Sequence, residues 1–194
     1  MLTPTTRTVT SAGYMTSDCL SEELCRRRIY ITQEITDSMA AEVCCQINHL
    51  SAASNEDITL WIMSPGGSVS AGLAILDTME NCGCDIRTII MGSAASMAAV
   101  IASSGTFGKR FIGSNANMMI HQALGGFSGQ TADILRTAQH IERINRQLYE
   151  ILAKNTGMSL QQIATDCDRD YHLNADEAIS YGLADHIFSG YNDW

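Results

Sequence analysis

Short apolar runs along the chain alternate with longer segments in which apolar residues recur every three or four positions. The runs are rich in β-branched residues, as buried strands are, and the longer segments have the period of an amphipathic helix. The pattern predicts strands at 29–31, 58–63, 86–91 and 118–120, and helices at 39–50, 71–79, 94–103 and 131–155. A last strand–helix–strand unit is predicted at 171–188, with Asn174 capping its helix. The alternation indicates one α/β domain.

Glycine-containing breaks separate several of these elements. The sequence Ser64-Pro65-Gly66-Gly67 follows the second strand, and its backbone N–H groups would be open to an oxyanion or an extended peptide. Gly92 and Ser93 are predicted to turn the chain after the third strand. The helix over 131–155 would be about 38 Å long, which exceeds the diameter of a domain of this size. Part of it should therefore project, and a projecting amphipathic helix needs a partner.

Composition and charge narrow the class of protein. With 194 residues, 45% of them hydrophobic and 17% charged, the chain suits one globular core. A formal net charge of −9 disfavours nucleic acid and acidic membrane surfaces as partners. No apolar block of signal-peptide length lies near residue 1, and the most apolar stretch, 89–103, is too short to span a membrane. The seven cysteines, an odd number, indicate a reducing compartment, and we expect the cytoplasm.

A few side chains are candidates for chemistry. His121 ends an apolar strand directly before a glycine-rich loop, where α/β proteins often carry site residues, and Ser96 lies in a segment rich in small residues. Each residue alone is more often structural than reactive, because a hydroxyl becomes a nucleophile only with a base and an orienting carboxylate in reach. The pattern does not fix the carboxylate, since Asp166, Asp168 and Asp170 all lie late in the chain and are typical of a solvated turn.

Other chemical motifs do not fit the sequence. The chain has no G-x-S-x-G sequence, so an α/β-hydrolase is not supported. The segment ending in Gly108-Lys109 resembles a phosphate loop, but Ser103 replaces its first glycine and Arg110 follows the lysine. Cys82 and Cys84 have no second pair at zinc-site spacing. We therefore expect no bound metal, nucleotide or other cofactor.

Four motifs taken together carry a family resemblance. They are Ser64-Pro65-Gly66-Gly67, the heptapeptide MGSAASM at 91–97, the octapeptide MIHQALGG at 119–126, and Asp168-Arg169-Asp170. In this order and spacing, from about residue 28 to residue 187, the chain resembles the ClpP family of self-compartmentalising serine peptidases. The resemblance implies an α/β fold of the crotonase/ClpP type, which is a spiral of β-β-α units with a projecting handle helix.

The same resemblance implies roles for individual residues. It makes Ser96 the nucleophile, His121 the general base and Asp170 the carboxylate that orients the base. It gives the oxyanion hole to the backbone of Gly67 and Met97. The residues that it implies for substrate binding are Gly66, Ser68, Val69, Leu124, Gly125 and Gly126. The residues that it implies for ring assembly are Gln130, Asp133, Asp168 and Arg169, with Asp133 expected near the base of the handle.

The resemblance also implies an organisation and partners. Residues 1–27 would form an N-terminal axial or docking segment, and residues 28–194 one peptidase domain whose handle spans about 125–155. Two stacked heptameric rings, of this chain alone or mixed with a ClpP paralogue, would enclose the sites. An AAA+ unfoldase of the ClpX, ClpA or ClpC type would supply unfolded polypeptide and use the ATP. The alternatives are a paralogous ring subunit that acts mainly in mixed assembly and a crotonase-type acyl-CoA enzyme.

Three departures from the family pattern affect the partner more than the chemistry. The segment 13–24 is not the arginine- and tyrosine-rich segment usual before the first strand. Thr59 and Asn81 stand where larger apolar side chains often line the unfoldase pocket, although Trp61 keeps one aromatic wall. Ala123 replaces a proline that usually follows the His-Gln pair. We expect the pocket to be shallower and more polar than in the family.

Overall fold

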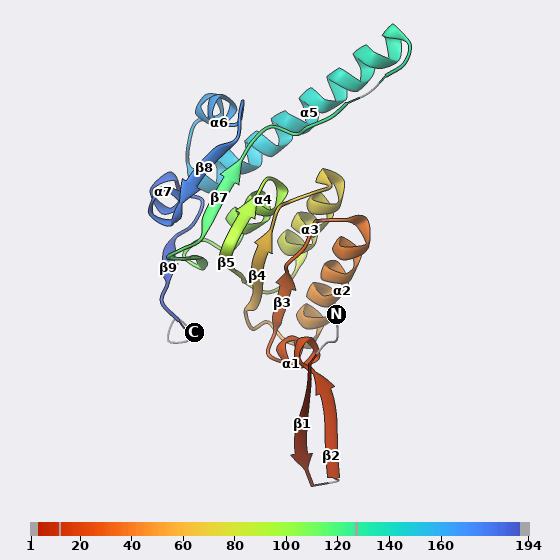
Figure 1. Cartoon of the computed structure of the whole chain (residues 1–194), viewed down its shortest axis with the longest axis vertical. Helices are drawn as coiled ribbons and strands as arrows, with labels where there is room; N and C mark the ends of the chain where they lie inside the picture. The colour runs from red at the N-terminus through yellow and green to blue at the C-terminus, as the bar shows by residue number, and fades with distance from the viewer. Residues whose placement is uncertain (1–3, 12, 127, 191–194) are drawn as a thin grey trace.

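The computed structural model describes residues 4–11, 13–126 and 128–190. The strands are β1 (Thr5–Thr10), β2 (Gly13–Asp18), β3 (Arg28–Ile31), β4 (Ile58–Ser64), β5 (Ile86–Ala95), β6 (Arg110–Gly113), β7 (Asn117–Ile120), β8 (Tyr171–Asn174) and β9 (His186–Phe188). The helices are α1 (Cys19–Cys25), α2 (Asp37–Ala53), α3 (Val69–Asn81), α4 (Met97–Ser103), α5 (Thr131–Thr156), α6 (Leu160–Asp166) and α7 (Ala175–Tyr181). Figure 1 shows a central body from which the β1–β2 hairpin and α5 project at opposite ends.

The central sheet is mostly parallel. Its strands follow the order β3-β4-β5-β6-β9, and β7 pairs in parallel with the end of β5 and antiparallel with β8. Helices α2 and α3 pack against each other beside β3 and β4 (Figure 1). The mixed α/β class and the parallel sheet confirm the fold class that the sequence predicts.

Isoleucine fills much of the core. Fully buried isoleucines come from β3, β4, β5 and β6 and from the helices α2, α3 and α4; they include Ile31, Ile62, Ile90, Ile112, Ile47, Ile75 and Ile101. The strands β3, β4 and β5 of the parallel sheet therefore read as nearly unbroken apolar runs, which the sequence pattern predicts. Removal of this surface from water is the main force that holds the body together.

The third predicted strand is longer than the sequence indicates. The predicted turn at Gly92 and Ser93 is wrong, because β5 continues through Ala95 and its last three residues pair with β7. Gly92 has a φ of 69°, so it bends the strand between its earlier partner β6 and its later partner β7 without ending it. The helix predicted from Ala94 accordingly begins at Met97.

Several elements escaped the sequence pattern. The β1–β2 hairpin, α1, β6 and α6 are all short, and the periodic signal of a short element is weak. The hairpin is mostly polar, although it presents Val9, Tyr14 and Met15 to its surroundings, and α1 has no buried residue. The hairpin and α1 precede residue 28, where the sequence places a separate N-terminal segment, and a docking role for that segment stays a prediction.

The helix α5 matches its predicted span closely and ends at Gly157, whose φ of 77° is typical of a helix C-cap. Of its 26 residues only Leu148 and Leu152 are buried. Figure 1 shows the first half of the helix extending beyond the body. Ile134 and Leu135, in that first half, are exposed. The projecting part of α5 therefore presents apolar side chains to its surroundings.

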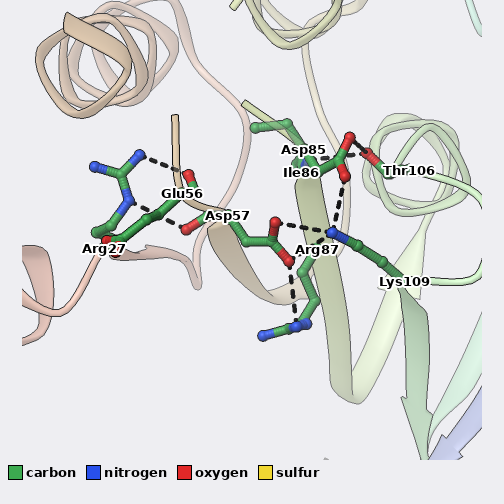
Figure 2. A network of polar contacts seen from close by, with 8 residues as sticks. All are labelled: Arg27, Glu56, Asp57, Asp85, Ile86, Arg87, Thr106 and Lys109. Carbon is green, nitrogen blue, oxygen red and sulfur yellow. Dashed lines mark hydrogen bonds and ion pairs between the residues drawn. The ribbon is translucent and has the colours of Figure 1, made fainter. Parts of the chain in front are cut away.

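A polar network joins the amino-terminal ends of β4 and β5 to the loop before β6 (Figure 2). Lys109 Nζ lies 2.8 Å from carboxylate oxygens of both Asp57 and Asp85, and Arg87 Nη2 lies 3.3 Å from Asp57 Oδ2. Arg27 donates a hydrogen bond to the backbone carbonyl of Asp57. Hydrogen bonding to the Lys109 ammonium lowers the pKa of Asp85. Lys109 thus bridges two carboxylates of its own chain, and Arg87 places a second positive charge beside Asp57.

Arg110 and Asp185 form a buried ion pair, with side chains only 3% and 8% exposed. Two side-chain hydrogen bonds join them, Nη2 to Oδ1 at 2.6 Å and Nε to Oδ2 at 3.0 Å, and the Arg110 backbone N–H also donates to Oδ2 at 3.0 Å. Arg110 Nη1 also donates to the backbone carbonyls of Ser103 and Asn155. Burial alone would raise the pKa of Asp185, but hydrogen bonding to Arg110 outweighs it and holds that pKa below its usual range. The pair therefore ties β6 to the ends of α4 and α5.

We expect the substitution Arg110→Met to lower the free energy of unfolding by about 3–5 kcal/mol, because it leaves the Asp185 carboxylate buried without a counter-charge. Urea unfolding at a fixed protein concentration measures the loss. Since the pKa of Asp185 is lowered by folding, the contribution of the pair is complete above the ordinary carboxyl pKa and lost in stronger acid. The difference in unfolding free energy between the wild type and Arg110→Met should therefore become smaller as the pH falls through that range.

The matched control is Arg146→Met, since Arg146 pairs with Glu150 on the exposed face of α5. A surface pair contributes little to stability, so this variant should unfold close to the wild type. Equal unfolding midpoints for the Arg110 and Arg146 variants would contradict the structural role of the buried pair.

Candidate active site

Ser96 directly follows β5 and has a strained backbone. Its φ of 56° and ψ of −126° fall in a region that residues other than glycine rarely adopt, at a cost of about 1–3 kcal/mol. The surrounding structure holds it there, because the Ser96 N–H donates to Met119 O at 2.8 Å. This bond continues the ladder between β5 and β7, in which Ala95 pairs with Met119. The sharp turn from β5 into α4 brings the Ser96 hydroxyl to His121.

Ser96, His121 and Asp170 are hydrogen-bonded in series. His121 Nε2 lies 2.8 Å from Ser96 Oγ, and His121 Nδ1 lies 2.9 Å from Asp170 Oδ1. The register of β7 and β8 accounts for the second contact, since Ile120 pairs with Tyr171 and the next residues on the two antiparallel strands are His121 and Asp170. The imidazole is 14% exposed and the carboxylate 61% exposed. When the carboxylate accepts Nδ1–H, Nε2 is left to accept the hydroxyl proton of Ser96.

The three late carboxylates have different environments. Asp166 ends α6 and accepts a hydrogen bond from Tyr181 Oη at 2.6 Å. The pKa of Tyr181 is raised mainly by burial and to a smaller extent by this bond. Asp168 is exposed, and its carboxylate lies 3.8 Å from Arg169 Nε. Only Asp170 among the three contacts His121 within the described part of the chain. The predicted solvated turn is therefore correct for Asp168 and wrong for Asp166.

The Gly66-Gly67 segment passes beside Ser96. It is held by a parallel bridge to Ile35 through backbone groups of the residues that flank Gly67, so the Gly67 N–H points away from that bridge. A Cβ on Gly66 would lie 2.8 Å from Ser96 Cβ, and a Cβ on Gly67 would lie 2.4 Å from Ile35 O, so both positions need glycine. Met97 begins α4, and its N–H precedes the hydrogen-bond pattern of the helix. The two amides thus suit a developing oxyanion.

The residues implied for substrate binding have different settings. Gly66 lies against Ser96, and Val69 lines a small apolar cavity of about 20 Å³ that Ser96 and His121 also line. Ser68 caps α3, with its hydroxyl accepting a backbone N–H. The segment 124–126 is exposed. Contact of any of these residues with substrate stays a prediction.

Gln122 is a site residue that the sequence analysis did not single out. Its backbone N–H donates to Cys167 O at 2.7 Å, and its side-chain Nε2 donates to Asp168 O at 2.9 Å. These bonds join the loop after His121 to the segment before Asp170. The sequence feature that could have identified Gln122 is its position directly after His121 in the 119–126 motif.

The residues implied for ring assembly lie in two separate places. Gln130 and Asp133 are at the start of α5, which Figure 1 shows at the tip of the projection, so the expectation of Asp133 near its base is wrong. Asp168 and Arg169 follow α6 on the body and are exposed. Within one chain the two sets lie apart, and a contact between subunits stays a prediction.

Trp61 belongs to an aromatic cluster on the sheet. Its ring stacks on Tyr30 with centroids 6.0 Å apart and meets the edge of Phe188 at 5.4 Å. Thr59, two residues earlier, is only 3% exposed, so in the isolated chain it does not line this surface as expected. Asn81 is exposed at the end of α3. Tyr30 and Phe188, which the sequence analysis did not single out, supply the apolar rings beside Trp61.

The cysteines are free thiols. Cys167 is buried, and burial raises the pKa of its thiol to about 12. In residues 4–11, 13–126 and 128–190, no group of three His, Cys, Asp or Glu side chains is placed to hold a metal ion. Within those same residues, no helix has the length and apolarity needed to cross a membrane.

Comparison with known proteins gives a consistent picture. The model of the family described as Clp protease matches residues 11–190. The ATP-dependent Clp protease proteolytic subunit of Streptococcus pyogenes serotype M5 (strain Manfredo) is 47% identical over 181 residues, which is 92% of each chain. The protein of the same name from Streptococcus pyogenes serotype M1 has the same identity and coverage.

We expect Asp170→Asn to lower the rate at which a fluorophosphonate modifies Ser96 by about 10³–10⁴, because the amide no longer holds the imidazole in the productive tautomer. The second-order rate constant of inactivation measures this loss. Asp176→Asn, an exposed substitution in the first turn of α7, is the control and should react at the wild-type rate. A near-normal rate for the Asp170 variant would mean that this carboxylate does not orient His121.

Proposed function

This chain belongs to the Clp protease family, and we propose that its serine peptidase reaction runs on Ser96, His121 and Asp170. The observation that carries the proposal is the unbroken series of hydrogen bonds, 2.8 Å from Ser96 Oγ to His121 Nε2 and 2.9 Å from His121 Nδ1 to Asp170 Oδ1. A crotonase-type acyl-CoA enzyme would have no use for such a series, which favours the peptidase over that alternative.

In the first half of the reaction Ser96 Oγ attacks the carbonyl carbon of a peptide bond while His121 Nε2 takes the hydroxyl proton. Asp170 stabilises the imidazolium that forms. The oxyanion accepts hydrogen bonds from the N–H groups of Gly67 and Met97. His121 then donates its proton to the leaving amine, the C–N bond breaks, and an ester remains on Ser96.

In the second half a water molecule attacks the ester carbonyl while His121 takes one of its protons. The oxyanion forms again between the same two amides. Return of the proton to Ser96 Oγ breaks the ester and releases the acid product. Every group that this sequence of steps needs is a side chain or backbone amide of the chain, so we propose that no cofactor binds here.

The proposed substrate is an extended, unfolded polypeptide. The Gly66–Val69 segment and the glycine-rich segment 124–126 offer backbone groups that suit main-chain pairing, which requires little side-chain specificity. The apolar cavity beside Ser96 has a volume of only about 20 Å³, so it admits no more than a small group next to the cleaved bond. The products would be short peptides.

Members of the Clp protease family assemble into rings and work with Clp ATPases. For this chain we propose two stacked heptameric rings, of one kind of subunit or mixed with a paralogue, in the cytoplasm. The apolar side chains on the projecting half of α5 support a contact between rings. The aromatic cluster around Trp61 supports docking of an AAA+ unfoldase of the ClpX, ClpA or ClpC type.

We expect Ser96→Ala to abolish both fluorophosphonate labelling and cleavage of a short fluorogenic peptide, because the variant lacks the only attacking oxygen of the proposed site. Peptide fluorescence and gel detection of a tagged fluorophosphonate measure the two losses. Sedimentation velocity on the same samples shows whether the variant assembles as the wild type does.

The control is Ser51→Ala. Ser51 lies on α2, far from His121 in the sequence, and its hydroxyl accepts the Gly83 N–H at 3.0 Å. It should retain labelling and turnover. Peptide cleavage by a purified, correctly assembled Ser96→Ala variant would show that another residue supplies the nucleophile.

A further inference from the structure

The loop that follows His121 touches the handle helix α5 at two points. Ala123 N–H donates a hydrogen bond to Asn145 Oδ1 at 2.7 Å, in a partly buried setting. Gly125 packs against Ile141, since a Cβ at that glycine would lie 2.6 Å from Ile141 Cδ1. Ile141 and Asn145 are four residues apart, so they share one face of the helix.

The same face of α5 continues into the site. Leu148 and Leu152 are buried and line the small cavity that Ser96 and His121 also line. Asn145 is therefore a polar side chain on an otherwise apolar face of α5, and it lies where the helix contacts the loop that follows His121. A leucine at this position would continue the apolar face. The Asn145 amide instead needs a polar partner, and the Ala123 N–H is that partner.

We propose that Asn145 is a positioning residue for His121, since its side-chain oxygen binds the Ala123 N–H and fixes the loop that carries the imidazole to Ser96. The inference rests on the proposed role of His121. A proline at position 123 would have no N–H to satisfy. Alanine introduces a partly buried donor, and Asn145 meets the need that this donor creates.

Two changes test the pair in a double-mutant cycle. Asn145→Leu removes the acceptor and leaves the donor, whereas Ala123→Pro removes the donor itself. The measured quantities are kcat and KM for a short peptide and the rate constant of fluorophosphonate inactivation, with sedimentation velocity on each variant. Asn145→Asp serves as the conservative variant, because a carboxylate oxygen accepts the same N–H.

We expect Asn145→Leu to lower kcat and the inactivation rate constant by about tenfold, because an unsatisfied donor displaces the loop and the imidazole with it. KM should rise as well, because segment 124–126 of the same loop is proposed to pair with the substrate. In the Ala123→Pro background the same substitution should cost less than about twofold, since no donor is left to satisfy. Asn145→Asp should restore most of the rate. If Asn145→Leu fails to fold, Asn145→Ala repeats the cycle without adding bulk.

An equal loss in both backgrounds would mean that Asn145 acts through packing of the handle, and the proposal would be overturned. No loss in either background would overturn it too. Failure of the proposed function has a different signature, because the wild type would then be inactive or Ser96→Ala would be active.

Discussion

The pairing of the last three residues of β5 with β7 is the interaction on which the rest of the site depends. It places the chain positions that follow the two strands next to each other, so Ser96 and His121 meet although 25 residues separate them. The antiparallel register of β7 with β8 then brings Asp170 to the other side of the imidazole. The strain at Ser96, about 1–3 kcal/mol, is small beside the ladder and the buried helix α4 that hold it.

The body behaves as one frame because its polar and apolar contacts join the same elements. Every residue of α4 is buried, and the ion pair of Arg110 with Asp185 binds the carbonyl groups at the ends of α4 and α5. One end of α5 is thus fixed to the body while its other half projects. Asn145 lies between these two parts, so the helix available for assembly also contacts the loop beside His121.

The sequence predicts the buried elements well and the small ones poorly. The strand around Ile62 and the helix ending at Gly157 follow from apolar period and cap chemistry. The run of β5 past Gly92 does not follow, because its cause is a ladder with a strand about 25 residues away. For the site, Ser96 and His121 were candidates by local setting, but residue patterns left three carboxylates open and the family resemblance chose Asp170. The contacts of Gln122 and Asn145 depend on side-chain geometry that no local pattern encodes.

The central claim is that two strand registers make Ser96 the reactive residue of the chain. The most direct measurement is to react the wild-type protein with a fluorophosphonate, digest it with trypsin and locate the added mass by fragmentation. Cleavage after Arg87 and Lys109 gives one peptide that contains Ser93, Ser96, Ser103 and Ser104. The account predicts a single adduct on Ser96. An adduct on any other residue, or none on an assembled protein that cleaves peptide, would contradict it.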